Sequence, residues 1–545
     1  MDKLTSILEA FDVICPSGLR GNFEARKGIL DELNSLSNIE TEFNAFLLSD
    51  FRERAGLFSS TGNDVPLEVT GSVLIIGAGL AGLYSALKIA SLGFEVQVVT
   101  DDEHVGGTWY RNDYPGSRVD ISRAVYPFSD VDYCDWRNYY PRHSEMKKYC
   151  EELASRVGDQ KIFLNKRVEK IEWSGQRSGW LVDFLKDGQK EQAFFNFVMD
   201  CTGQLSSPRK LPQADGFSGE ICSAPSWPAG MDLRGKKVAL VGLAASGIQI
   251  ASAISGDVSE LHIVSGTPNW IRMIPHLKLG DGMDKFSHGQ YAFDLKARAQ
   301  AAIGGFQALV KENSTAQAEL LNACENWLEQ LPEDKADLVR PDYRPGLRRI
   351  LLDNGDYADC LKQQNVFYHA TRLESCDNRT LYLKSGELVP DVDVLILSTG
   401  FDVLSSHFPY RVVDRTGLER IEKPVTGFGS VCFEALPNFF QINGYGTNLV
   451  LHGAATILME IQTAFSAARM LEACHTNGSG SVFEISSGAV DDYRLDFKAM
   501  HDSLIWSEAP EKQGWYWGIS RENPTNLPMT MGRYIEMLKG LNTSP

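Results

Sequence analysis

Two glycine-rich stretches, each directly after an apolar run, constrain the fold of this chain more than any other feature. They are IIGAGLAG (75–82) and VGLAASG (241–247). Glycines at these spacings allow a strand to turn sharply into a helix, whose first N–H groups and positive dipole end favour a phosphate group. The sequence therefore predicts two βαβ units of the dinucleotide-binding, Rossmann-like kind within an α/β fold.

From residue 71 onward, apolar strands alternate with helical stretches, a pattern that predicts parallel sheets. The chain has 545 residues, which is enough for two or three domains. We expect the second unit to be inserted into the first, and the strand within 391–402 to return to the first unit. The expected order is a helical N-terminal extension (1–68), the first part of the first unit (69–210), the second unit with a helical insert at about 275–340 (211–388), and the rest of the first unit with the C-terminal segment (389–545).

The N-terminal extension carries apolar residues at three-to-four spacing, which is typical of one face of a helix. They are Ile29, Leu33, Leu36, Phe43, Phe46 and Leu47. Such a stripe must pack on something. We favour a helical lid on the main body, and the alternative is a docking element that joins copies into a homo-oligomer or recruits a partner.

Charge and cysteine usage narrow the class of protein. The net charge of −18 argues against nucleic acid and anionic membranes as partners. Ten cysteines without a C-x-x-C pair, and a start without the pattern of a secretory leader, predict reduced thiols in a cytoplasmic protein. The long apolar run at 73–94 contains the first glycine-rich turn, so we interpret it as strand, turn and helix. No spacing typical of metal ligands is present.

In the first glycine-rich loop each glycine has a separate physical task. Gly77 permits the tight turn, Gly79 lets the backbone approach a pyrophosphate, and Gly82 lets helix and strand pack closely. An acid is expected at the end of the next strand to meet the adenosine ribose. Spacing puts Thr100 there, so Asp101 or Asp102 must substitute.

A third stretch, GGTWYRNDYPGSRVD (106–120), is the most specific signal, and we call it the fingerprint segment. It matches in full the pattern (A/G)-G-x-W-x-x-x-x-(F/Y)-P-(G/M)-x-x-x-D. The chain thereby resembles the type I Baeyer–Villiger monooxygenases over about residues 70–540. DCTGQLSSP (200–208) and STGFD (398–402) agree with that family, and the C-terminal part is similar to its 4-hydroxyacetophenone monooxygenase branch.

The resemblance implies an FAD-dependent enzyme, reduced by NADPH or NADH, that inserts one oxygen atom of O2 beside a ketone carbonyl to give an ester or lactone. It places FAD in the first unit and the nicotinamide cofactor in the second. The residues implied for FAD are Gly77, Gly79, Gly82, Asp101, Gly107, Thr108, Trp109, Asp120, Tyr126, Val168, Asp402 and Asn448. Those implied for NADP are Gly242, Ser246, Gly247, Thr267 and Arg348.

The family stabilises the developing oxyanion with an arginine that an aspartate orients. RPGLRRILL (344–352) matches its arginine segment, so the resemblance places the catalytic pair at Arg349 and Asp120. A desolvated Asp–Arg pair fixes the guanidinium plane and suits this task. The alternatives are a turn-capping aspartate and a surface ion pair.

Three positions depart from the family pattern, all on the nicotinamide side. Ser223 replaces a histidine in FSGEICSAPSWP (217–228), Ala244 replaces the middle glycine of the second loop, and Gly266 replaces an arginine for the 2′-phosphate. Overpacking by the methyl group of Ala244 costs about 1–3 kcal/mol, which weakens cofactor binding without abolishing it. Because no acid takes the arginine position, we expect NADPH over NADH.

Two other functions stay open. One is a related flavoprotein with a degenerate nicotinamide site, which uses an external reductant or catalyses a non-oxidative reaction. The other is a non-catalytic flavoprotein that binds a partner. An N- or S-oxygenating flavin monooxygenase does not need Arg349, so its presence argues against that class. Candidate substrate-pocket residues, which would suit a bulky or aromatic ketone, are Trp270, Asn448, His452, Trp515, Tyr516 and Trp517.

Overall fold

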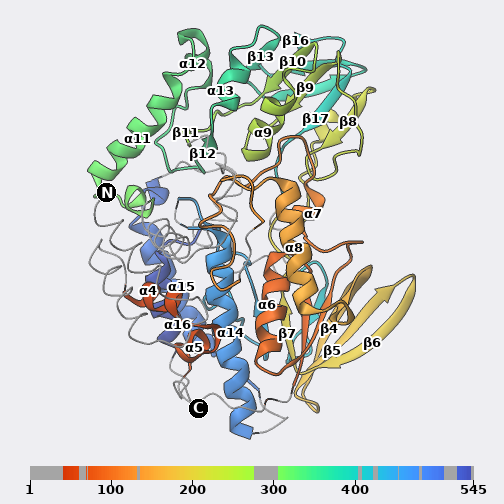
Figure 1. Cartoon of the computed structure of the whole chain (residues 1–545), viewed down its shortest axis with the longest axis vertical. Helices are drawn as coiled ribbons and strands as arrows, with labels where there is room; N and C mark the ends of the chain where they lie inside the picture. The colour runs from red at the N-terminus through yellow and green to blue at the C-terminus, as the bar shows by residue number, and fades with distance from the viewer. Residues whose placement is uncertain are drawn as a thin grey trace.

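The computed structural model describes residues 41–59, 69, 71–131, 135–274, 305–402, 408–420, 427–451, 453–477, 482–508 and 525–541. Figure 1 shows two α/β units stacked along the long axis, with helices along one side. Within the described residues, no helix combines the length and apolar character needed to cross a lipid bilayer.

The first unit is built on a parallel sheet in the order β20-β7-β1-β2-β3. Its strands are β1 (Ser72–Ile76), β2 (Glu95–Val99), β3 (Ile162–Phe163), β7 (Phe197–Asp200) and β20 (Phe439–Gln441). The helices α6 (Leu80–Ser91), α8 (His143–Val157) and α14 (Ala455–Asn477) pack on it, and the short α7 (Thr108–Arg111) lies in the fingerprint segment. Because β20 follows the whole second unit in sequence, the chain returns to its first sheet.

A mainly antiparallel sheet extends the first unit in the order β19-β18-β4-β5-β6. Its strands are β4 (Lys166–Ser174), β5 (Gly179–Lys186), β6 (Gln189–Phe195), β18 (Arg411–Val413) and β19 (Glu419–Arg420). One apolar cluster, which includes Val168 and Trp180, joins this sheet to strands β1 and β7. The short helix η1 (Asp159–Lys161) precedes β3.

The second unit is a parallel sheet in the order β13-β10-β9-β17-β8. Its strands are β8 (Glu220–Ser223), β9 (Lys237–Val241), β10 (Glu260–Val264), β13 (Val366–His369) and β17 (Val394–Leu397), with α9 (Ala245–Ile254) and α13 (Asp356–Leu361) packed on it. The expectation for the strand within 391–402 is wrong. It does not return to the first unit, because β17 pairs in parallel with β9 and β8 of the second.

Smaller elements complete the two units. They are β11 (Ile271–Met273) with β12 (Leu351–Asp353), the hairpins of β14 (Leu373–Asp377), β15 (Thr380–Leu383) and β16 (Leu388–Val389), the short helices η2 (Pro212–Ala214), η3 (Phe306–Leu309) and η5 (Ile505–Glu508), and the helices α11 (Ser314–Leu328), α12 (Glu333–Val339), α15 (Ser487–Asp502) and α16 (Met531–Lys539). The expected helical insert is helical over α11 and α12, and residues 275–304 lie outside the described ranges.

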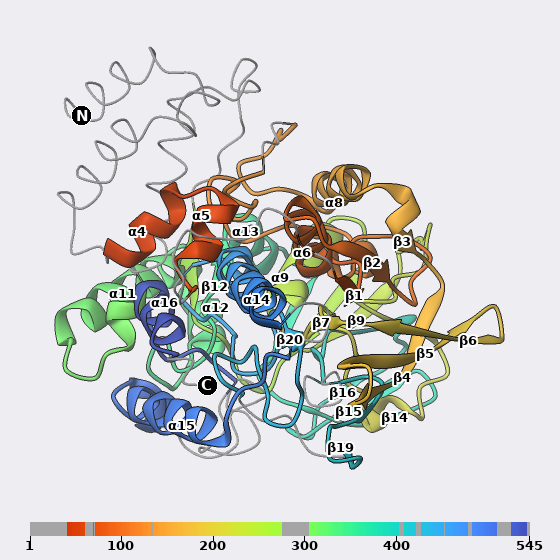
Figure 2. The same ribbon diagram turned by 90° about the horizontal axis from the view of Figure 1, so that it is seen from below.

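The N-terminal helices α4 (Thr41–Leu48) and α5 (Phe51–Gly56) lie against α14 and α16 (Figure 2). Phe43, Phe46 and Leu47 are fully buried in the main core of the first unit. For these residues the apolar stripe packs on the body of the same chain, as the favoured interpretation predicts. Ile29, Leu33 and Leu36 lie outside the described residues.

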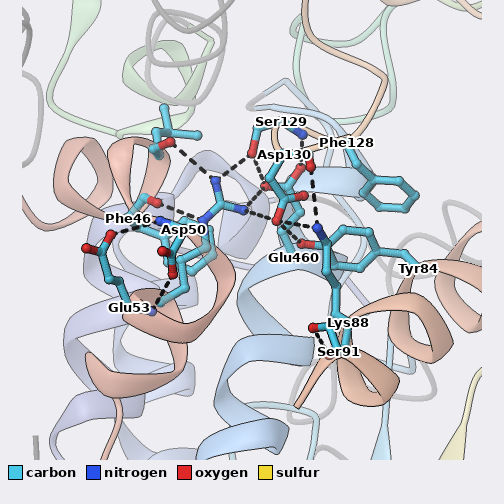
Figure 3. A network of polar contacts seen from close by, with 12 residues as sticks. Phe46, Asp50, Glu53, Tyr84, Lys88, Ser91, Phe128, Ser129, Asp130 and Glu460 are labelled. Atoms are coloured by element: carbon cyan, nitrogen blue, oxygen red, sulfur yellow. Dashed lines mark hydrogen bonds and ion pairs between the residues drawn. The ribbon is translucent and has the colours of Figure 1, made fainter. Parts of the chain in front are cut away.

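A buried arginine fixes α5 to this core. Arg54 is 1% exposed, and its guanidinium group donates to Glu460 Oε2 at 2.9 Å and to Ser129 Oγ at 2.7 Å. Glu460 on α14, which is 0% exposed, also accepts the backbone N–H of Ser129 at 2.6 Å. Figure 3 shows how Ser129, Asp130 and Glu460 converge between the helices. Arg54 and Lys88 lower the pKa of Asp130, although burial alone raises it.

Removing Arg54 should destabilise the fold strongly, because Glu460 is left as a buried charge without its main partner. We expect Arg54→Ala to lower the free energy of unfolding by about 3–5 kcal/mol in a denaturant titration. The matched control is Arg52→Ala in the same helix, where the side chain is only half-buried. Equal free energies of unfolding for the two variants would show that Arg54 does not stabilise the fold through this cluster.

Candidate active site

A cavity of about 700 Å³ opens where the strands β1, β2 and β7 end, and it reaches toward the second unit. Both the first glycine-rich loop and the fingerprint segment line it. The sequence-predicted residues on its wall are Gly77, Gly79, Asp101, Gly107, Thr108, Trp109, Asp120, Tyr126, Val168, Arg349 and Asn448. Sequence positions that are far apart therefore meet at one concave site.

The first glycine-rich loop has the geometry that its spacing predicts. Gly77 has a φ of +108°, and a Cβ atom on it would lie 2.5 Å from the carbonyl oxygen of Cys201. A Cβ on Gly82 would lie 1.8 Å from the carbonyl oxygen of Gly77. The absence of a side chain at Gly82 therefore lets α6 pack closely against the end of β1. Neither position can carry a side chain in this backbone.

The cavity side of the same loop is bare backbone. Gly79 is the N-cap of α6 and no side chain caps the helix there. A Cβ on Gly79 would come no closer than 3.7 Å to any other group, the nearest being the Cα of Gly107. An uncapped helix N-terminus beside open space fits a diphosphate group, because its N–H groups and dipole favour negative charge. The residues present therefore fit the dinucleotide half of FAD.

The two acids after β2 both line the cavity, and Arg111 holds them. Arg111 donates through Nε to Asp102 at 2.8 Å and through Nη2 to Asp101 at 3.2 Å. Burial raises the pKa of Asp102, while Asp101 is the more exposed of the two. Thr100 is buried, and its hydroxyl accepts the backbone N–H of Asp102 at 3.2 Å. Thr100 thus shapes the turn that presents the two carboxylates.

Asp120 and Arg349 form an ion pair at the junction of the two units. Arg349 Nη2 lies 2.6 Å from Asp120 Oδ2, and the two side chains are 34% and 15% exposed. The carboxylate comes from the fingerprint segment, and the guanidinium group comes from the connection that follows α12. Both groups line the cavity. The arginine retains exposed surface with which to meet a ligand.

An aromatic pair borders the same cavity. Trp109 Nε1 donates to the hydroxyl of Tyr126 at 3.1 Å, and the two rings are nearly perpendicular with their centroids 6.0 Å apart. Burial raises the pKa of Tyr126, so the phenol stays protonated at neutral pH. This arrangement gives the site a neutral, apolar side next to the Asp120–Arg349 pair.

The fingerprint segment also contacts α9 of the second unit. The hydroxyl of Tyr114 donates to Gln249 Oε1 at 3.1 Å, and Gln249 Nε2 donates to the carbonyl oxygen of Arg118 at 3.1 Å. Gly116 has a φ of +80°, and a Cβ on it would lie 2.6 Å from the carbonyl oxygen of Gln249. Sequence reasoning missed Gln249, for which the only signal is a polar residue within an apolar helix.

The second glycine-rich loop repeats the backbone of the first. Gly242 has a φ of +92°, and a Cβ on it would lie 2.4 Å from the carbonyl oxygen of Ser398. A Cβ on Gly247 would lie 2.7 Å from the carbonyl oxygen of Gly242. Ala244 caps α9 with a φ of −115°, an extended conformation that alanine adopts without strain, and it is exposed. The loop therefore keeps its shape despite the added methyl group.

The remaining predicted residues lie away from the wall of the 700 Å³ cavity. Asp402 donates its backbone N–H to Ser207 at 2.8 Å. The hydroxyl of Ser246 lowers the pKa of Tyr114, although burial raises it more. The guanidinium group of Arg348 lies 5.2 Å from the ring centre of Tyr343. Gly242 and Thr267 lie in loops of the second unit, and Gly247 lies in the first turn of α9.

The residues predicted for the substrate pocket lie in different parts of the structure. Trp270 is 5% exposed and donates through Nε1 to the carbonyl oxygen of Tyr343 at 2.5 Å, so it is a core residue and not a pocket wall. Asn448 lines the cavity and donates to Asn526 Oδ1 at 2.6 Å. His452, Trp515, Tyr516 and Trp517 lie outside the described residues.

Comparison with known proteins agrees with this geometry. Residues 70–300 match the family described as flavin-binding monooxygenase-like. A Baeyer–Villiger monooxygenase of Streptomyces coelicolor is 26% identical, in an alignment that covers 85% of this chain and 89% of the relative. One of Pseudomonas aeruginosa is also 26% identical, over 87% of this chain and 90% of the relative. A solved structure of oxidised steroid monooxygenase bound to NADP superposes with a TM-score of 0.73 at 23% identity, over 86% of this chain and 97% of that chain.

The fold and the sequence relatives define the class together. The chain is a flavin-dependent monooxygenase related to the Baeyer–Villiger monooxygenases. The family resemblance drawn from the fingerprint segment is thereby confirmed. Assignment to the 4-hydroxyacetophenone branch stays a prediction.

The close approach of the fingerprint segment to α9 can be tested at Gly116. Gly116→Ala meets both a positive φ and the carbonyl oxygen of Gln249, whereas Gly188→Ala meets a similar φ of +76° with open space around it. We expect the free energy of unfolding to fall by about 1–3 kcal/mol more in Gly116→Ala than in Gly188→Ala, because backbone atoms must shift. Thermal unfolding and bound FAD content measure the difference. Equal losses in the two variants would show that the contact with α9 is unimportant.

Proposed function

We propose that this enzyme converts a ketone to an ester or lactone, with FAD as the resident cofactor and NADPH as the reductant. In this reaction a ketone, O2, NADPH and a proton give the ester, NADP+ and water. The observation that carries the proposal is the Asp120–Arg349 pair, 2.6 Å apart, on the wall of the same cavity as the first glycine-rich loop. An N- or S-oxygenation has no carbonyl oxygen that needs such a cation.

The residues for FAD are those of the uncapped α6 N-terminus, the acids after β2 and the fingerprint segment. FAD supplies the activation of O2 when it is bound. Gly79 and Gly107 would present bare backbone to the diphosphate, and Asp101 or Asp102 would accept the ribose hydroxyls. Trp109 and Tyr126 exclude water from one side of the site.

Arg349 has the catalytic task in this proposal. As the carbonyl carbon is attacked, negative charge develops on the ketone oxygen, and a preplaced cation lowers the free energy of that state. Asp120 orients the guanidinium plane, so little reorganisation is needed at the moment of reaction. Because both side chains are partly shielded from water, their electrostatic effect is larger than it would be at a free surface.

The second unit would bind NADPH through the loop at Gly242, Ser246 and Gly247 and through Thr267 and Arg348. The preserved turn geometry supports a working nicotinamide site over the degenerate alternative. The aromatic run Trp515, Tyr516 and Trp517 in the sequence favours a bulky or aromatic ketone. Ten cysteines without a C-x-x-C pair favour the cytoplasm, where NADPH is supplied.

Replacement of Arg349 tests the proposed chemistry. We expect Arg349→Ala to keep its FAD and to lower ester formation by about 10²–10³-fold, which is the loss typical of one preorganised oxyanion donor. Arg344→Ala is the matched control, because Arg344 lies in the same segment but forms an exposed ion pair with Glu508. Product analysis with cyclic, linear and aryl ketones gives the rates. Normal ester formation by Arg349→Ala, or no ester from any ketone with the unmodified enzyme, would contradict the proposal.

A further inference from the structure

The end of β10 lacks the residue that would distinguish NADPH from NADH. In a βαβ unit the loop after this strand meets the adenosine ribose, where an acid binds the 2′-hydroxyl of NADH and a nearby arginine accepts the 2′-phosphate of NADPH. Here the loop consists of Ser265, Gly266 and Thr267, which carry no charge. Any discrimination by charge must come from another segment.

The neighbouring strand supplies such a segment. β13 pairs in parallel with β10, so that Val264 lies beside His369 and both strands end at the same edge of the sheet (Figure 1). The backbone N–H of Ser265 donates to the carbonyl oxygen of His369 at 3.1 Å. The connection from β13 to β14 therefore lies directly against the loop after β10. Arg372 is in that connection.

Gly266 leaves the space through which the side chain of Arg372 passes. A Cβ on Gly266 would lie 2.3 Å from Cγ of Arg372 and 3.0 Å from its Nε. An arginine at 266 and the present course of Arg372 thus exclude each other. The glycine at 266 therefore makes room for an arginine from the connection that follows the adjacent strand.

The guanidinium group of Arg372 is available for an anion. Arg372 is exposed, and no ion pair or side-chain hydrogen bond to it occurs within the described ranges. The nearby carboxylate of Glu387 is directed at His369, 3.3 Å from Nδ1. The backbone carbonyl of Arg372 accepts the N–H of Lys384 at 2.9 Å, which fixes the start of the side chain.

The same edge carries the glycine-rich loop for the pyrophosphate. The backbone N–H of Gly242 donates to the carbonyl oxygen of Val264 at 3.0 Å, so this loop and the end of β10 have a fixed relative position. A dinucleotide whose pyrophosphate lies at α9 has its adenosine ribose at the end of β10. The charged side chain of Arg372 contacts the loop after β10 at Gly266.

We propose that Arg372 recognises the 2′-phosphate of NADPH, in the place that Gly266 leaves open. The inference rests on the proposed function, because it assumes a nicotinamide cofactor in the second unit. Thr267 and Ser265 offer hydroxyl groups on the same loop, while the guanidinium group provides the charge and the fork of donors that a phosphate accepts.

The test is direct binding to the full-length, FAD-loaded protein. Calorimetry measures the dissociation constants of adenosine 2′,5′-bisphosphate and NADP+, which carry the 2′-phosphate, and of 5′-AMP and NAD+, which do not. Arg372→Ala should weaken the first two by roughly 10- to 100-fold and leave the second two within about twofold. Arg372→Lys should recover part of the loss, because it keeps the charge but not the fork.

Two further variants sharpen the result. Lys190→Ala removes an exposed positive charge on β6, in the other unit, and should change none of the four constants. The double variant Gly266→Arg/Arg372→Ala should regain affinity for the 2′-phosphate, because the clash between the two positions is gone. An unchanged preference for NADP+ in Arg372→Ala, or an equal loss for all four ligands, would overturn the inference and leave the proposed reaction standing.

Binding by the unmodified protein separates the two proposals. If it binds neither NADP+ nor NAD+, then the nicotinamide part of the proposed function fails and the inference fails with it. If Arg348→Ala removes the preference for the 2′-phosphate and Arg372→Ala does not, then the phosphate is held from the other side and only the inference is overturned.

Discussion

The contact between Asp120 and Arg349 is the interaction on which the site depends, because it joins the two units where the chemistry is proposed. One partner comes from the fingerprint segment of the first unit, and the other from the connection that follows α12 in the second unit. Around this pair, Tyr114 and Gly116 bring the same segment against Gln249 on α9. A short stretch of chain thus contacts the cavity on one side and the second unit on the other. Its motif therefore constrains domain packing as well as cofactor binding.

A buried charge cluster also stabilises the first unit. Arg54 on α5 reaches into the core and pairs with Glu460 on α14, and α14 packs on the sheet that ends at the cavity. Buried ion pairs are costly to form but more costly to break, so this cluster favours one position of the N-terminal helices. The described part of the N-terminal extension is therefore an integral layer of the first unit.

Local patterns in the sequence were sufficient for much of the site. The glycine spacing predicted both turns, and the positive φ values of Gly77 and Gly242 follow from the need to reverse the chain before each helix. The resemblance paired Asp120 with Arg349, which are 229 positions apart in the sequence. Strand order was not predictable in the same way. β17 is an apolar run that suits either sheet, and only its pairing with β9 and β8 decides between them.

Contacts between distant segments account for the other differences. Gln249 and Arg372 belong to no motif, and their importance comes from what lies across from them in space. Trp270 is typical of a pocket wall by residue type, yet its indole N–H bonds to a backbone carbonyl within the core. Gly266 indicates a lost phosphate contact when the loop is considered alone. In the structure it leaves space for the side chain of Arg372, which lies in the connection between β13 and β14.

In the proposed reaction both units work together, so that the nicotinamide cofactor of the second unit reduces the flavin of the first. The most direct test is to add NADPH, and separately NADH, to the FAD-loaded protein without oxygen while the absorbance of oxidised flavin is followed. We predict rapid loss of that absorbance with NADPH and a slower loss with NADH. No loss with either nucleotide, in a protein whose flavin dithionite still reduces, would contradict the account.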